Sequence, residues 1–139
     1  MTHVYERPIR FEDVDAAGIV FFARFFSYAH EAMESLFDAL DGGYVHLTMD
    51  RHIGMPAVHV NADYKSPLRF GDVARISVTT PHVGNKSCTY RYELHRKKDG
   101  VLCAVIEHTC AVTDLLAMKA IPIPEDVRAV LEKHRPLKA

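Results

Sequence analysis

The sequence predicts an α+β fold in which a five-stranded antiparallel sheet wraps around one long central helix, with a short helix at the C-terminus. Two observations lead to this prediction: one long segment with helical periodicity, and a series of strand-like segments separated by short turns. Strands joined by short turns pair antiparallel, and an amphipathic helix beside a single sheet buries its apolar face against it. We expect one domain over residues 1–139.

The first expected elements are a strand over residues 3–12 and a helix from Phe21 to about Leu40. The strand alternates apolar and charged side chains with a period close to two, and DVDAAG at residues 13–18 interrupts the alternation. On a helical wheel of about 100° per residue, apolar side chains fill one half and polar side chains the other, except for Ala23. This apolar half is wider than a coiled-coil seam, so the helix should lie against a whole sheet.

Four further strands are expected after an irregular stretch at residues 43–55. Their approximate ranges are 56–66, 72–83, 86–97 and 101–114. The segments between them carry glycine, proline or asparagine, and Asp99-Gly100 is typical of a hairpin turn. A helix from Pro124 to about His134 follows, because proline is favoured at an early helical position.

Composition and charge argue against several classes of function. The chain has 17 basic and 18 acidic side chains, a balance that offers no strong footprint for nucleic acid or for an anionic membrane. No apolar run reaches the roughly 20 residues that span a bilayer, and the N-terminus lacks the apolar segment of a signal peptide. Three cysteines without CxxC spacing fit a reducing compartment, so we expect a cytoplasmic protein.

Motifs for metal or nucleotide chemistry find little support. His30-Glu31 lacks the second histidine of HExxH, and no cysteine pair has zinc spacing. Neither a GxSxG elbow nor a P-loop occurs. Cys103 and Cys110 lie in an apolar strand-like run and are expected to be buried small hydrophobes. The expected chemistry therefore uses no metal and no cofactor.

The informative segment is RFEDVDAAGIVFFARFF, at residues 10–26. Asp13 and Asp15 stand just before a glycine-containing turn that leads into the apolar helix. Amides in the first helical turn have no intrahelical partner and carry partial positive charge, so they can stabilise a carbonyl oxygen on which negative charge develops. A carboxylate beside them could attack that carbonyl or activate water. Aspartates before helices also commonly act as caps, and the pattern alone leaves both roles open.

Residues 13–22, DVDAAGIVFF, resemble the signature D-x-D-x-x-G-[IV]-V-[YFW] of the 4-hydroxybenzoyl-CoA thioesterase family, which opens the long helix of the hotdog fold. The family's order of elements matches the expected order across nearly the whole chain. The resemblance implies an acyl-CoA thioesterase in which Asp15 is the catalytic carboxylate, the backbone N–H of Phe22 polarises the thioester carbonyl, and Gly18 keeps the turn tight. It also implies a structural Asp13. Family members with a histidine in this motif would have it at position 22. This chain has Phe22 there, so the backbone N–H is the donor that remains.

Two routes remain open for Asp15. Aspartate is ordinarily ionised at neutral pH, which suits attack on the thioester to give a mixed anhydride that water then cleaves. General-base activation of water by the same carboxylate is the alternative. The sequence does not decide between them.

Substrate-binding residues are predicted in three places. Phe21 and Phe25, at the start of the helix, would pack around the reacting group. His59, in the segment PAVHVNADYKSPLRFGD, either lines the acyl pocket or pairs with a neighbouring strand. Lys86, with Ser87 as a neutral donor, is the candidate for binding the phosphates of coenzyme A, because related enzymes hold them near this hairpin; the alternative is a solvated turn lysine.

The same 56–72 segment and His30-Glu31-Ala32 resemble the branch of the family that hydrolyses 1,4-dihydroxy-2-naphthoyl-CoA. The expected substrate is an aromatic acyl-CoA, such as 4-hydroxybenzoyl-CoA or 1,4-dihydroxy-2-naphthoyl-CoA, with coenzyme A as part of the substrate. An open sheet edge favours a homo-oligomer, and the resemblance implies dimers that pair into tetramers.

Two other functions are compatible with the same fold. A hydratase or dehydratase acting on acyl-CoA would need a histidine–carboxylate pair near the helix start, whereas the first histidine after Asp15 is His30. A non-catalytic acyl-CoA-binding module would keep the pocket without turnover, and the retained Asp15 argues against it.

Overall fold

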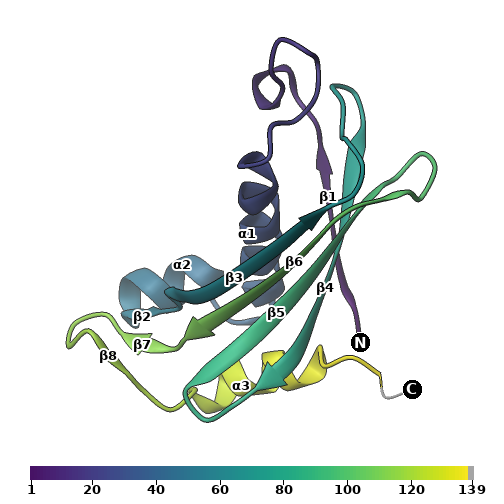
Figure 1. Cartoon of the computed structure of the whole chain (residues 1–139). Helices are drawn as coiled ribbons and strands as arrows, with labels where there is room; N and C mark the ends of the chain where they lie inside the picture. The colour runs from purple at the N-terminus through teal and green to yellow at the C-terminus, as the bar shows by residue number, and fades with distance from the viewer. Residues whose placement is uncertain (138–139) are drawn as a thin grey trace.

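A twisted antiparallel sheet holds the long helix α1 (Arg24–Leu36) against one face in the computed structural model, which describes residues 1–137 (Figure 1). The sheet has five strands, in the order β1 (His3–Pro8), β4 (Val73–Val83), β5 (Ser87–Arg96), β6 (Leu102–Ala111) and β3 (Ala57–Tyr64). All four pairings are antiparallel. The predicted α+β class and five-stranded sheet are therefore confirmed, and β3 is an edge strand.

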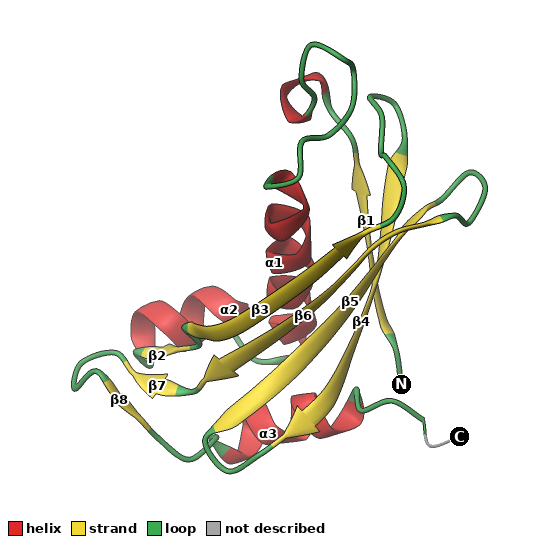
Figure 2. Cartoon of the chain, in the orientation of Figure 1, coloured by secondary structure: helices red, strands yellow, loops and turns green. Residues whose placement is uncertain are grey.

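Several short elements were not predicted. They are α2 (Gly43–Val45), a π-helical turn at His46–Asp50, and the strands β2 (Ile53–Gly54) and β8 (Lys119–Ala120). The ends of the predicted helix and of the last predicted strand form separate short elements, a 3-10 helix at Phe37–Ala39 and β7 (Thr113–Asp114). The three short strands form a second small sheet, shown with the other strands in Figure 2. A strand of two residues has no measurable periodicity, so the sequence pattern could not reveal it.

The first strand and the long helix are both shorter than predicted. β1 ends at Pro8, and a 3-10 turn covers Phe11–Asp13. There, Asp13 Oδ2 accepts the backbone N–H of Arg10 at 2.8 Å, which draws the chain out of the extended conformation. The helix begins at Arg24 rather than Phe21, after a turn.

The core lies between α1 and the inner face of the sheet. The buried side chains of α1 recur at helical spacing and are Phe25, Tyr28, Ala29, Ala32, Met33 and Leu36. The C-terminal helix α3 (Glu125–Lys133) packs near the end of β4, where Thr80 Oγ1 donates to the carbonyl of Leu131 at 2.5 Å. The apolar half of α1 is wider than the covered face, because Phe26 is 39% exposed; Phe22, in the turn before the helix, is 68% exposed.

Within residues 1–137, none of the helices has the length and apolarity that crossing a bilayer requires.

A buried ion pair joins β1 to the loop that precedes α1. Arg7 Nη1 donates to Asp13 Oδ2 at 2.9 Å, and Arg7 Nε donates to Glu31 Oε1 on α1 at 3.1 Å. The Asp13 side chain is fully buried. Burial alone would raise the pKa of Asp13, but the N–H of Arg10 and the guanidinium of Arg7 outweigh that effect and hold the pKa below its ordinary value. These contacts fit a structural role for Asp13.

Removal of this carboxylate should destabilise the protein strongly. We expect Asp13→Ala to lower the free energy of unfolding by about 3–5 kcal/mol, because the buried Arg7 would lose its fully buried partner and keep only the contact with Glu31. Urea unfolding at pH 7 measures the loss. Because the pKa of Asp13 is lower in the folded state than in the unfolded state, its ionised form stabilises the fold above the ordinary carboxyl range. The difference from wild type should therefore shrink in acid, as the pH falls through the lowered pKa.

A suitable control is Asp41→Ala, which removes an exposed carboxylate in the loop after α1 and should change the free energy of unfolding by no more than about 0.5 kcal/mol. Equal losses in the two variants would contradict a specific contribution from the buried pair.

Candidate active site

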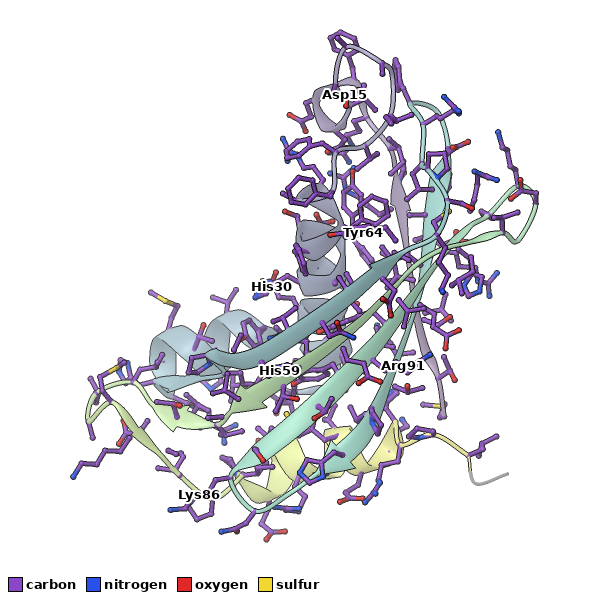
Figure 3. All side chains as sticks on the ribbon, in the orientation of Figure 1. Asp15, His30, His59, Tyr64, Lys86 and Arg91 are labelled. Atoms are coloured by element: carbon purple, nitrogen blue, oxygen red, sulfur yellow. The ribbon has the colours of Figure 1, made fainter. Side chains whose placement is uncertain are left out.

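Asp15 lies in the loop between β1 and α1, beyond the N-terminal end of the helix (Figure 3). Its N–H donates to the carbonyl of Ile19 at 3.0 Å, and its carbonyl accepts the N–H of Gly18 at 2.9 Å. Gly18 has a φ of +76°, a conformation that glycine adopts without steric cost. This turn agrees with the role predicted for Gly18.

The carboxylate of Asp15 is only partly used by the turn. Oδ1 accepts the N–H of Ala17 at 2.9 Å, whereas Oδ2 has no hydrogen-bond partner within residues 1–137. The side chain is exposed and borders an open hollow of about 780 Å³. Phe11 and Phe70, whose rings meet edge-on at 5.8 Å, also line this hollow. One oxygen therefore caps the turn and the other is available to a ligand.

The backbone N–H of Phe22, the predicted carbonyl donor, is also available. In the turn before α1, Arg24 N–H donates to the carbonyl of Phe21 at 3.0 Å and Phe25 N–H to that of Phe22 at 3.3 Å. No acceptor for the Phe22 N–H is found in the part of the chain that the structure describes. A free amide at a helix start is a suitable donor to a developing oxyanion.

Tyr64, at the end of β3, fixes the segment that carries this amide. Its hydroxyl donates to the carbonyl of Phe22 at 3.0 Å, and its ring meets Phe25 and Phe22 edge-on, with centroids 5.3 Å and 6.4 Å away. Burial raises the pKa of Tyr64, which keeps the hydroxyl a donor at neutral pH. Tyr64 was not predicted from the sequence. The feature that could have indicated its role is an aromatic residue at the end of a strand that is otherwise poor in large side chains.

Asp15 and Phe22 border two different hollows in a single chain. Phe22, Phe25 and Tyr64 line the second hollow, of about 330 Å³, and neither of these two hollows is lined by both Asp15 and Phe22. Phe25 lies beside the proposed donor, and its role in substrate binding stays a prediction. Phe21 lines neither hollow, and the guanidinium of Arg24 lies 5.9 Å from the centre of its ring.

The other predicted binding residues lie away from this region. Lys86 is exposed and lies at the opposite end of the molecule from Asp15, next to Ser87 at the start of β5 (Figure 3). A single chain therefore does not bring Lys86 to the Asp15 loop, and its role in binding phosphates stays a prediction. His59 also stays a prediction, because side chains alternate along a strand and Val60, its neighbour, is the one that faces a cavity.

Within residues 1–137, no group of three or more histidine, cysteine, aspartate or glutamate side chains is arranged to hold a metal ion. Cys88, Cys103 and Cys110 are free and buried, as expected for Cys103 and Cys110.

The chain is similar to several known proteins. The chain is 29% identical to a 1,4-dihydroxy-2-naphthoyl-CoA hydrolase of Nostoc punctiforme, over 97% of this chain and 90% of that protein. It is 32% identical to a protein of the same name from Synechococcus elongatus, over 92% and 93% of the two chains. The crystal structure of a gentisyl-coenzyme A thioesterase, 28% identical, superposes with a TM-score of 0.78 over 93% of this chain and 98% of that one. Residues 9–131 match the thioesterase-like superfamily. The predicted hotdog fold is therefore confirmed, and the chain belongs to the thioesterase-like superfamily.

Proposed function

We propose that this protein hydrolyses an aromatic acyl-CoA thioester to the free acid and coenzyme A. The proposal rests on two groups near the helix start that have no partner within residues 1–137. One is the backbone N–H of Phe22, and the other is one carboxylate oxygen of Asp15, in the turn that comes shortly before Phe22 in the sequence. The relatives named above act on aromatic acyl thioesters, as their names state, and this supports an aromatic acyl group here.

In the proposed reaction, the thioester carbonyl accepts a hydrogen bond from Phe22 N–H while its carbon is attacked from the side of Asp15. If Asp15 Oδ2 attacks directly, the carbon–sulfur bond breaks, the thiolate of coenzyme A leaves, and water cleaves the resulting anhydride. If Asp15 instead takes a proton from water, the hydroxide attacks the same carbon. Both routes end in the same products.

Asp15→Asn should abolish most of the turnover. We expect kcat to fall by about 10²–10⁴-fold, because the amide is neither a nucleophile nor a base. Thiol release from 4-hydroxybenzoyl-CoA and 1,4-dihydroxy-2-naphthoyl-CoA measures this. Glu12→Gln, which neutralises an exposed carboxylate bordering the same hollow, should retain activity. Equal rates for Asp15→Asn and wild type would rule out the catalytic role.

The same assay tests the remaining expectations. We propose that no metal or cofactor takes part, so EDTA should leave the wild-type rate unchanged. A wild-type protein that binds these thioesters without releasing thiol would be the non-catalytic module instead.

Tyr64→Phe should lower kcat by about 2–10-fold and leave KM nearly unchanged, because one neutral hydrogen bond that fixes the Phe22 segment would be lost. Steady-state kinetics on the same thioesters separates the two parameters. Tyr44→Phe is a control, because Tyr44 borders a different hollow. A change in KM alone would show that Tyr64 binds substrate and does not position the donor.

We further propose that the protein is a homo-oligomer that assembles through β3. This strand pairs on one side only, with β6, and each of its residues except Ala62 is exposed. Val58 is 63% exposed. An unpaired edge with exposed apolar side chains favours pairing with a second strand, and the open hollows beside Phe22 and Asp15 would then lie near a subunit boundary.

Val58→Asp should shift the oligomer towards monomer, because a charge would be placed on the proposed contact edge. Sedimentation equilibrium measures the distribution of species. Val4→Asp makes the same change on β1, at the opposite edge of the sheet, and should leave the assembly intact. An unchanged oligomer in Val58→Asp would exclude β3 as the contact.

A cytoplasmic location remains part of the proposal. Cys88 and Cys110 occupy directly opposite positions on β5 and β6, and both are free thiols. The support is compositional: three cysteines without CxxC spacing are typical of a reducing compartment.

A further inference from the structure

A small cavity lies between α1 and the sheet, separate from the two hollows described above. Its volume is about 170 Å³. α1 contributes Phe26, Ala29 and His30, and the sheet contributes Val60, Tyr92, Ile106 and His108. A cavity of roughly 150 Å³ lined by apolar side chains can bind benzene, so this one has room for an aromatic ring.

The exposed apolar stripe of α1 connects the Phe22 amide to this cavity. Phe26 and His30 are four residues apart and therefore share one face of α1, and Phe22 stands in the turn two residues before the helix. With a rise of about 1.5 Å per residue, His30 lies ~6 Å beyond Phe26. A thioester held at Phe22 can thus direct its acyl group along this stripe into the cavity.

Two of the residues that the sheet contributes to this wall, Tyr92 and His108, carry polar groups. Tyr92 is only 1% exposed, and its hydroxyl lies 3.2 Å from His108 Nδ1. His108 Nε2 lies 3.1 Å from Cys110 Sγ. Burial, and to a lesser extent the nearby His30, lower the pKa of His108, so its ring is neutral and carries one proton. A hydroxyl has one proton and two lone pairs, so Tyr92 can make another hydrogen bond whichever tautomer His108 adopts.

His30 supplies a second polar group, on the helix side. Its Nδ1 lies 3.1 Å from Glu34 Oε2, and both side chains are about half exposed. The pairing orients the ring and leaves Nε2 without a partner in the part of the chain that the structure describes. With Nδ1 as the donor to Glu34, Nε2 is an acceptor for a ligand hydroxyl.

We propose that this cavity binds the ring of a hydroxylated aromatic acyl group, and that Tyr92 and His30 are the residues that select the ring hydroxyl. His108 and Glu34 are positioning residues that orient them. The inference rests on the proposed thioesterase function and goes further, because it names the groups that distinguish a hydroxylated acyl group from its unsubstituted parent. A site built to bond a hydroxyl discriminates against an analogue without it, because its own polar groups are then left unpaired.

The first test compares two buried tyrosines. The selectivity is the ratio of kcat/KM for 4-hydroxybenzoyl-CoA to that for benzoyl-CoA, and likewise for 1,4-dihydroxy-2-naphthoyl-CoA against 2-naphthoyl-CoA. In Tyr92→Phe we expect this ratio to fall about tenfold, mainly because kcat/KM for the hydroxylated substrate falls. Tyr90→Phe is the matched control, because Tyr90 is equally buried and stacks on Tyr92, but its hydroxyl donates to Met55 Sδ and it does not line the cavity.

The second test uses a helix-surface pair that does not depend on core packing. His30→Ala should lower the same ratio severalfold, and Glu34→Gln should do so to a smaller extent. His46→Ala is the matched control, because His46 forms a similar pair with Asp50 at four-residue spacing, 2.7 Å apart, away from the cavity.

The outcomes separate this inference from the proposed function. If wild type hydrolyses the thioesters but Tyr92→Phe and His30→Ala keep the wild-type ratio, or Tyr90→Phe lowers it equally, the inference is wrong and the function stands. If wild type releases no thiol, calorimetric binding of 4-hydroxybenzoate and benzoate provides the ratio instead. A preference for 4-hydroxybenzoate that is lost in both cavity variants would then support the inference without the function, and the absence of any preference would overturn it.

Discussion

The ion pair between Arg7 and Asp13 is the constraint on which the candidate site depends. Asp13 is buried completely and is bonded to both the Arg7 guanidinium and the Arg10 N–H. An unpaired charge at that depth would be strongly destabilising, so the loop has few alternatives to the conformation that satisfies it. That conformation determines where the following turn begins, and the turn carries Asp15. The position of the exposed Asp15 carboxylate is thus fixed by the buried carboxylate of Asp13, two residues earlier in the chain.

The long helix has a double role that follows from its composition. One part of its apolar surface, including Phe25 and Tyr28, packs into the sheet. Phe26 on the helix and Phe22 in the turn before it remain exposed and border the cavities that we assign to the substrate. A helix with only the narrower apolar face would pack as well against the sheet but would offer no apolar path for an aromatic group. Excess hydrophobicity on a helix of a single chain is therefore informative about function.

The sequence predicted the architecture well, because strands of ten residues and a long helix have clear periodicities. It also placed Asp13, Asp15 and Gly18 together in a turn before the helix, because residues close in sequence stay close in any fold; the catalytic role of Asp15 stays a prediction. The sequence did not predict contacts between segments that lie far apart along the chain. Tyr64 reaches Phe22 from 42 residues away, and Tyr92 meets His108 from a neighbouring strand. The binding roles of His59 and Lys86 have no support within one chain, since no property of a lone residue in a strand or turn shows which face or end of the molecule it will occupy.

Side chains alternate along β3, so neighbouring residues of this strand face different surroundings. Val60 and Tyr64 point towards the cavities beside α1, while His59 and Asp63 have the opposite parity and face away from them. Substitutions at His59 and Asp63 can therefore change the way copies of the chain pack in the proposed oligomer, while those at Val60 and Tyr64 change which molecules fit. Quaternary arrangement and substrate choice can diverge independently in descendants of this chain, although a single strand of eight residues contributes to both.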